Sequence, residues 1–316
     1  MPTVTTTRLA FIVLLLSVLL AALRVPKYSN PTFTDLESIP SLEATGKQEK
    51  ILLVTAHPDD ECLFFAPTLL GSTFGASQDV KTNPELFSVC LSIGDADGLG
   101  SVRRDEYERS LDVLGIKKDN RMVLDLPELQ DSIHLPWKAE DIANAVQPFV
   151  EKYGITTILT FDQGGISGHP NHKSIPQGIT HLISTYPSDL ESAAIPRPRL
   201  YTLITVPLSI KYISILAPLL AKYDLYAAQI LHYIVLMLES RASPTSTRSD
   251  SGSDGTKPSV STPQAYPNSI PVFVSGMKEY LTALRAMKEH WSQLVWFRWL
   301  NVMFSRYMWV NEWVEV

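Results

Sequence analysis

KILLVTAHPDDE, residues 50–61, joins a short apolar run to a cluster of potential metal ligands. Residues 51–56 are almost continuously apolar, as expected for a parallel strand that is covered on both faces. Pro58 then removes a backbone donor and ends regular pairing. In open parallel sheets, ligands bind at the carboxyl ends of the strands. The stretch therefore predicts a buried strand that delivers a site containing His57, Asp59, Asp60 and Glu61.

A second stretch repeats this design farther along the chain. ITTILTF, residues 155–161, is another short β-branched run, and DQGGISGHPNH, residues 162–172, follows it with Asp162, His169 and His172. Each of these residues taken alone has a simpler explanation, as part of a solvated turn or as an incidental histidine. Two clusters at two predicted strand ends weaken that explanation and favour one shared site.

The residue types in the two clusters fit a hydrolytic metal centre. A catalytic zinc ion typically has three protein ligands of the His and carboxylate type and an open fourth position. His57, Asp60 and one histidine of the second cluster supply such a set. Asp59 and the other histidine remain for proton transfer and for stabilising a developing oxyanion. The composition of the clusters predicts metal-assisted hydrolysis.

The motifs AHPDDE and GHPNH, with SIGDADGLGSVRRDEYERSLDVLGI between them, resemble the LmbE-like (PIG-L) deacetylase family. The resemblance runs from about residue 50 to 206 and resumes in MKEHWSQLVWFRWLNVMFSRYM near the C-terminus. It implies that His57, Asp60 and His172 bind the metal. It also implies that Asp59 is the general base and that His169 stabilises the tetrahedral intermediate.

The resemblance further implies a substrate and a metal. GISGHPNH is similar to the eukaryotic branch of the family, which deacetylates N-acetylglucosaminyl-phosphatidylinositol (GlcNAc-PI) in GPI-anchor synthesis. Zinc is the expected ion, although iron or cobalt accepts the same ligands. Ser167 and Asn171 stand where bacterial relatives carry a Tyr and an Asp, so the roles of those two residues are not carried over.

Arg103 lies on the apolar stripe of a predicted helix that follows the glycine-rich residues 92–100. A permanent cation at the mouth of the crevice suits a phosphodiester or a polyol, and the family pattern implies a substrate contact. The alternative is an ion pair with Glu106 or another local carboxylate.

Strand-like and helix-like segments alternate along the chain from residue 50 onward. Strands are predicted at 51–56, 86–93, 122–126, 155–161 and 201–206, with helical patterns between them. This order is typical of an α/β fold with a Rossmann-like, mostly parallel sheet and helices on both faces.

Composition excludes some function classes. The chain has 316 residues, 45% of them hydrophobic, and a formal net charge of −6. There is thus no overall electrostatic basis for binding nucleic acid. The two cysteines, Cys62 and Cys90, lie in apolar segments and suit reduced, buried thiols in a domain that faces the cytosol.

Residues 1–25 contain the apolar run Leu9–Leu23, flanked by Arg8, Arg24 and Lys27. The run is shorter than the ~20 residues of a typical transmembrane helix. A cleaved signal peptide is the rival interpretation. The basic residues after the run and the lack of a clean small-residue cleavage site favour a signal anchor. We therefore predict a single-pass protein of the endoplasmic reticulum (ER) membrane whose catalytic domain faces the cytosol.

The remaining segments differ in character. We predict a linker at residues 26–49 and the deacetylase domain at residues 50–239. Within that domain, the apolar stretch 208–238 is either a buried helix or a membrane contact. Residues 240–267 are rich in Ser, Thr, Pro and Gly and predict a disordered insertion. Residues 268–316 predict a helical, Trp-rich part of the catalytic domain.

These observations predict an amide hydrolase that releases acetate from GlcNAc-PI. One alternative is a deacetylase of a soluble GlcNAc conjugate, with residues 1–25 as a signal peptide. Another is a catalytically inactive, membrane-tethered scaffold, against which the intact set of histidines and aspartates argues. The expected partners are the lipid substrate and the ER membrane.

Overall fold

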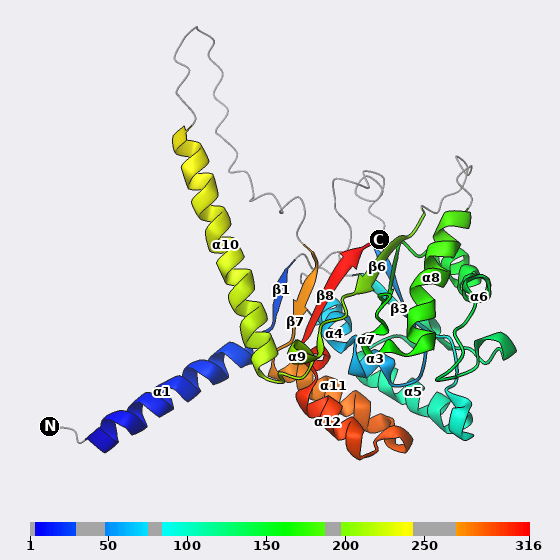
Figure 1. Ribbon diagram of the computed structural model, residues 1–316, viewed down its shortest axis with the longest axis horizontal. Coiled ribbons are helices and arrows are strands. Elements are labelled where there is room, and N and C mark those ends of the chain that lie inside the picture. The colour runs from blue at the N-terminus through cyan, green and yellow to red at the C-terminus, as the bar shows by residue number, and fades with distance from the viewer. Residues whose placement is uncertain (1–3, 30–47, 75–83, 187–196, 243–269) are drawn as a thin grey trace, which may run out of the picture.

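The computed structural model describes residues 4–29, 48–74, 84–186, 197–242 and 270–316. Within them an eight-stranded sheet has the order β1-β7-β8-β6-β5-β2-β3-β4 (Figure 1). The strands are β1 (Lys27–Ser29), β2 (Lys50–Thr55), β3 (Glu85–Cys90), β4 (Arg121–Val123), β5 (Thr157–Phe161), β6 (Arg199–Leu203), β7 (Val272–Val274) and β8 (Val310–Glu315).

Helices flank this central sheet and extend from one end of the molecule (Figure 1). They are α1 (Val4–Arg24), α3 (Asp60–Leu63), α4 (Ala66–Phe74), α5 (Gly100–Leu114), α6 (Ala139–Tyr153), α7 (Gly165–Gly168), α8 (Pro170–Thr185), α9 (Leu208–Lys211), α10 (Leu216–Ala242), α11 (Met277–Glu289) and α12 (Trp296–Phe304). The mixed α/β fold is therefore confirmed.

The parallel part of the sheet places the site. Strands β4, β3, β2, β5 and β6 are parallel neighbours, and the chain builds outward from β2 in one direction and from β5 in the other. Right-handed crossovers on either side of such a reversal place their helices on opposite faces of the sheet. Ligands bind at this point, outside the carboxyl ends of the strands. Here that point lies between the ends of β2 and β5.

Three antiparallel strands extend the sheet beyond β6. Strand β8 pairs with β6 and β7, and β1 pairs with β7. The C-terminal part, which we predicted to be helical, thus contributes two strands as well as α11 and α12. Trp313 of β8 is fully buried, and its ring stacks on Phe65 with a centroid separation of 5.9 Å. The C-terminal residues are therefore part of the same core as β2 and α4.

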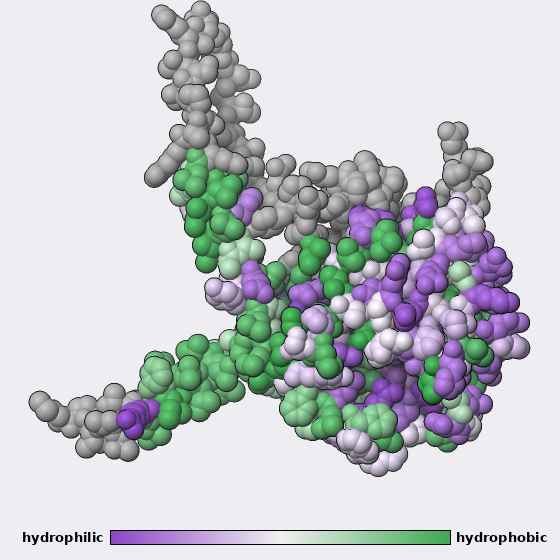
Figure 2. All heavy atoms as spheres, in the orientation of Figure 1, coloured by the Kyte–Doolittle hydropathy of each residue, from purple (hydrophilic) through white to green (hydrophobic). Residues whose placement is uncertain are grey.

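Helices α1 and α10 carry many exposed apolar side chains. Figure 2 shows hydrophobic residues along both helices and at the part of the molecule from which the two helices extend. Even so, none of the helices in the described ranges is both long enough and apolar enough to cross a bilayer. The predicted apolar stretch 208–238 becomes α9 and most of α10. The predicted linker, residues 26–49, is wrong in one part, because Lys27–Ser29 form β1 of the sheet. Residues 30–47 of that linker lie outside the described residues, as does the predicted insertion from 243 onward.

Candidate active site

The site begins where β2 ends. Residues Ile51–Val54 are almost completely buried, and the chain then turns sharply so that the amide of Asp60 donates to the carbonyl of His57 (3.3 Å). Asp59 has φ 111°, a left-handed conformation that costs a non-glycine residue about 1–3 kcal/mol. The surrounding contacts must hold this strained turn in place.

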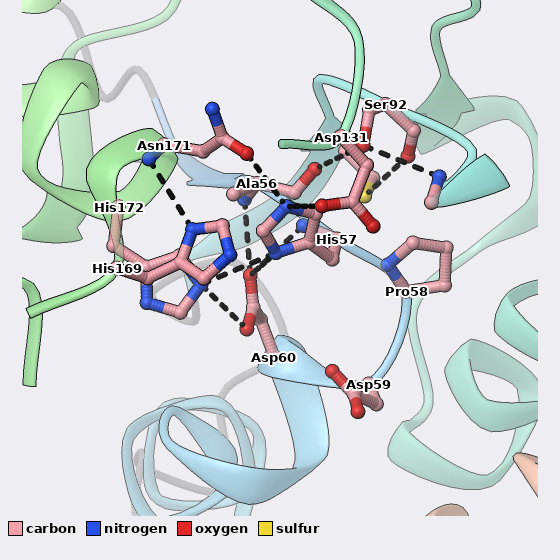
Figure 3. Close-up of polar contacts among 12 residues, drawn as sticks. Ala56, His57, Pro58, Asp59, Asp60, Ser92, Asp131, His169, Asn171 and His172 are labelled. Atoms are coloured by element: carbon pink, nitrogen blue, oxygen red, sulfur yellow. Dashed lines mark hydrogen bonds and ion pairs between the residues drawn. The ribbon is translucent and has the colours of Figure 1, made fainter. Parts of the chain in front are cut away.

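His57, Asp60 and His172 lie close together (Figure 3). His172 Nε2 lies 3.3 Å from His57 Nδ1 and 3.2 Å from Asp60 Oδ1. Asp60 Oδ2 lies 3.9 Å from His57 Nδ1. Two ligand atoms about 2.0–2.1 Å from one tetrahedral ion are separated by about 3.3 Å, so this spacing fits a metal site.

The other ring nitrogen of His57 fixes its tautomer. His57 Nε2 lies 3.2 Å from Asn171 Oδ1 and 3.1 Å from Asp131 Oδ1. The Asn171 amide is oriented by the backbone, since its Oδ1 accepts from the Ser132 amide and its Nδ2 donates to the Leu135 carbonyl. Both neighbours of His57 Nε2 are acceptors, so that nitrogen carries the proton. In the neutral ring, the lone pair of His57 Nδ1 then faces Asp60 and His172.

His172 is held in the same manner. Its Nδ1 lies 3.1 Å from the Gly165 carbonyl, which can only accept, so Nε2 has the lone pair. Its ring stacks on Phe161 at a centroid distance of 4.1 Å. Two nitrogen lone pairs and a carboxylate thus meet in a buried space, an arrangement that a cation stabilises. The donor set therefore fits a divalent metal.

Charges around these residues shift their pKa values. Burial alone would raise the pKa of Asp60, but His172 and His57 hold it well below its usual range. Burial alone would lower the pKa of His57, but the hydrogen bond to Asp131 and the charges of Asp60, Asp131 and Asp59 raise it. Asp60 is therefore an anion and a ready ligand at neutral pH.

His169 lies beside His57 and His172, and the ligand atoms of these three histidines all lie within 4.8 Å of one another, so His169 also belongs to the group that could hold a metal ion. Its ring centroid is 4.7 Å from that of His57 and 5.1 Å from that of His172. Burial and then the charges of His57 and His172 lower its pKa to about 4, so the ring is neutral at physiological pH. The backbone N–H of Asn171 donates to His169 Nδ1 (3.3 Å). Because Nδ1 accepts this bond, the proton of the neutral ring is on Nε2. His169 can therefore donate a hydrogen bond to an oxyanion.

Asp59 is buried, and its carboxylate stands apart from the ligand atoms in Figure 3. Its partner is Arg298 of α12, whose Nη2 lies 2.8 Å from Asp59 Oδ2. Burial raises the pKa of Asp59, while Arg298 opposes the rise and Asp60 adds to it. The raised pKa makes the Asp59 carboxylate a stronger base than an ordinary aspartate, as a proton acceptor requires.

Glu61 holds the strained turn from the other side. Its Oε2 accepts from the Asp59 amide (3.0 Å), and its Oε1 accepts from Ser110 of α5 and from His290 Nε2 (2.6 Å). Glu61, Cys62 and His290 also form a second group of potential metal ligands. Because His290 already bonds directly to Glu61, and burial raises the pKa of the Cys62 thiol, we assign this group to support of the turn.

Arg103 lies at the mouth of the site, but its carboxylate partner is not Glu106. Its Nη1 donates to the Gly94 carbonyl (2.6 Å) and lies 3.5 Å from Asp131 Oδ2, and its Nη2 donates to the Pro58 carbonyl (3.2 Å). Glu106 instead accepts two hydrogen bonds from Ser292. Arg103 therefore ties the turn after β2 to the loop that contains Asp131.

Sequence reasoning missed Asp131, Arg298 and the pair Glu61–His290 as parts of this site. Asp131 is in an irregular segment before α6, and Arg298 and His290 are more than 220 residues from the turn that they support. Glu61 was recognised as part of the motif, but its bond to His290 has no local signal. Asn171, whose role we did not carry over, proves to orient His57.

Comparison with known proteins places these residues in a recognisable family. The family model described as PIG-L, GlcNAc-PI de-N-acetylase, matches residues 52–183. The N-acetylglucosaminyl-phosphatidylinositol de-N-acetylase of Bos taurus is 32% identical over 268 residues, which cover 84% of this chain and 83% of that protein. A Schizosaccharomyces pombe protein named as a probable enzyme of this kind is 31% identical over 275 residues, with 84% and 88% covered.

The N,N'-diacetylchitobiose deacetylase from Pyrococcus horikoshii aligns over 90% of this chain and 94% of its own, with 15% sequence identity and a TM-score of 0.49.

Proposed function

Since the chain belongs to the PIG-L family, we propose that it is a deacetylase that hydrolyses GlcNAc-PI to glucosaminyl-phosphatidylinositol and acetate, the deacetylation step of GPI-anchor biosynthesis. The observation that supports this most strongly is the convergence of His57 Nδ1, Asp60 and His172 Nε2, with His169 beside them. This intact set also argues against a catalytically inactive scaffold.

We propose that His57, Asp60 and His172 hold a divalent metal, most readily zinc, because two imidazoles and one carboxylate are a common ligand set for that ion. Iron or cobalt accepts the same ligands. When bound, the ion would polarise the acetyl carbonyl and make the attacking water more acidic. Asp131 and Asn171 keep His57 in the tautomer that presents Nδ1.

The chain's own residues then move the protons. Asp59 takes a proton from the attacking water, and its raised pKa lets it return that proton to the leaving amine. His169 donates from Nε2 to the oxyanion of the tetrahedral intermediate, which a neutral imidazole can do at physiological pH.

Arg103 is the proposed contact to the inositol phosphate. Its guanidinium is fixed by two carbonyl groups and Asp131, and its Nε has no hydrogen-bond partner among the described residues. A fixed, permanent cation beside the site suits a phosphodiester, although the Nε of Arg103 is itself buried. Arg103→Ala should then reduce activity on the lipid more than activity on a substrate that lacks the phosphate, whereas equal losses would indicate a structural role alone.

Acetate release tests the proposed reaction. The purified full-length protein should release acetate from GlcNAc-PI and much less from free GlcNAc, with metal content measured on the same sample. Comparable rates on free GlcNAc would favour a deacetylase of a soluble sugar. Release from neither substrate by metal-loaded protein would contradict the proposal.

We further propose that the enzyme works at the cytosolic face of the ER membrane, with α1 as its N-terminal membrane attachment. The support is the row of exposed apolar side chains on α1 between Arg8 and Arg24. A tag in segment 31–46 should be digested by protease on intact microsomes, and the mature protein should retain Met1. Protection of the tag without detergent, or a new N-terminus after residue 23, would contradict this placement.

A further inference from the structure

Helix α12 presents an apolar face that the described residues leave uncovered. Val302 is buried against the body, but six large apolar side chains of this short helix are exposed: Trp296, Phe297, Trp299, Leu300, Met303 and Phe304. Trp296 is 75% exposed. Soluble monomers rarely leave so many neighbouring apolar side chains in water without a binding function.

The apolar face continues onto a second segment. The amide of Ser214 donates to the carbonyl of Phe304 (2.9 Å), and Ser214 Oγ donates to the carbonyl of Met303 (2.6 Å). These bonds join α12 to residues 208–216, whose exposed apolar side chains are Leu208, Ile210, Tyr212, Ile215 and Leu216. We call residues 208–216 and 296–304 together the apolar rim.

Each half of the apolar rim bonds to one of the loops that build the active site. Arg298 of α12 pairs with Asp59 in the loop after β2. Lys211 of α9 donates to the carbonyl of Ile166 (3.0 Å) in the loop after β5, directly after Gly165, which orients His172. The rim is therefore fixed to both sides of the site.

We propose that the apolar rim is the surface on which the enzyme rests on a phospholipid bilayer, so that the head group of a lipid enters the active site while its acyl chains stay in the bilayer. This inference rests on the proposed function, which makes the substrate a lipid. Tryptophan and phenylalanine favour the lipid–water boundary. The rim has no Asp or Glu, and its two charged residues, Lys211 and Arg298, point inward to the Ile166 carbonyl and to Asp59, so no unpaired charge opposes contact of the exposed apolar side chains with lipid.

Fluorescence quenching tests the contact without relying on catalysis. Vesicles of phosphatidylcholine and phosphatidylinositol, with lipids brominated near the head group, are added to the full-length wild type and to Trp296→Phe. The difference between the two emission spectra isolates the Trp296 indole. We expect that signal to be quenched several-fold and shifted to the blue. An unquenched Trp296 signal on vesicles that bind the protein would overturn the proposal.

Kinetics provide the second test, with matched aliphatic substitutions. Leu208→Ser combined with Leu300→Ser changes both halves of the rim, and Val316→Ser changes a similarly exposed side chain at the C-terminal edge of the sheet. The double variant should lose about 10-fold in kcat/KM on GlcNAc-PI in vesicles, through KM. For the double variant, we expect wild-type Tm and wild-type activity on a water-soluble analogue without acyl chains. For Val316→Ser, we expect wild-type values of kcat/KM on vesicles, of activity on the soluble analogue and of Tm.

The outcomes separate the rim from its rivals. Unchanged vesicle kinetics in the double variant, or an equal loss on both substrates, would overturn the proposal. A concentration-dependent dimer in sedimentation that the double variant loses would assign the rim to a second copy of the chain. Absence of acetate release by the wild type would contradict the proposed reaction but leave the quenching result interpretable as a lipid contact.

Discussion

Arg298 Nη2 lies 2.8 Å from Asp59 Oδ2, which links the exposed helix α12 to the strained turn after β2. The Asp59 side chain is 2% exposed and that of Arg298 is 28% exposed, so the pair lies at the boundary between the core and the solvent. The proposed base is thus held by a residue far away in the sequence.

Removing this cation should impair catalysis while metal binding stays intact. Arg298→Ala leaves a buried carboxylate without its ion partner, which favours the protonated form and frees the side chain. We expect kcat to fall by about 10-fold or more, within the range for general-base catalysis, and Arg298→Lys to recover part of the loss. A wild-type kcat in Arg298→Ala would show that the pair does not support the base.

The three proposed ligands should act together. His57→Ala, Asp60→Ala and His172→Ala each remove one of three ligands, so each variant should lose bound metal and activity in parallel. His181→Ala is the control, because His181 lies on α8 with His172 but outside the site. Stoichiometric metal in all three variants, measured by elemental analysis, would rule out this ligand set.

Asp131 should tune metal affinity through His57. Removal of a carboxylate that orients a ligating histidine typically costs 10–100-fold in metal affinity or activity. Asp131→Ala should therefore weaken metal binding by about this factor in a chelator competition. Asp125→Ala, which removes a half-exposed acid paired with Arg104, should leave affinity unchanged. Equal affinity in both variants would contradict the role of Asp131.

Glu49 should make stability depend on pH. Burial raises its pKa from 4.5 to about 7, against opposing effects of Thr157 and Arg199. The folded state prefers the neutral carboxyl, so the contribution of Glu49 is fully present below pH 4.5 and is lost as the pH rises through about 7. At pH 8, Glu49→Gln should be more stable than the wild type by an amount on the order of 2 kcal/mol. Denaturation at pH 5 and pH 8 measures the difference, and an equal gain at both values would contradict it.

The part of the site that was predictable from the sequence is the part encoded locally. The apolar run before His57 and the three-residue spacing to Asp60 identify a strand end with ligands, and the second run identifies the neighbouring strand. Parallel pairing of β2 with β5, in register from Ile51 with Thr157 to Leu53 with Leu159, then brings His172 to His57. The resemblance of the AHPDDE and GHPNH motifs to a known family then implied which of these residues bind the metal and which act as base or stabilise the oxyanion.

The remaining features depend on packing between distant segments. Strands β1 and β7 have only three residues each, too few for a recognisable alternation, and they are defined by their pairing, β1 with β7 and β7 also with β8. From the sequence, Arg298 was interpreted as part of an aromatic, basic C-terminal tail, because no neighbouring residue indicates that its partner is a buried carboxylate. Similarly, the partner of Arg103 is Asp131 rather than the nearby Glu106, since the loop before α6 folds over the site.

The most direct test of the account is acetate release from GlcNAc-PI by Asp59→Asn, with bound metal measured in the same sample. Asparagine keeps the size of the side chain but removes the proton acceptor. The account predicts a full complement of metal and a kcat lower by about 10² or more. His169→Ala should behave in the same way, because its proposed contribution is to the oxyanion. A metal-loaded Asp59→Asn enzyme that turns over near the wild-type rate would contradict the account.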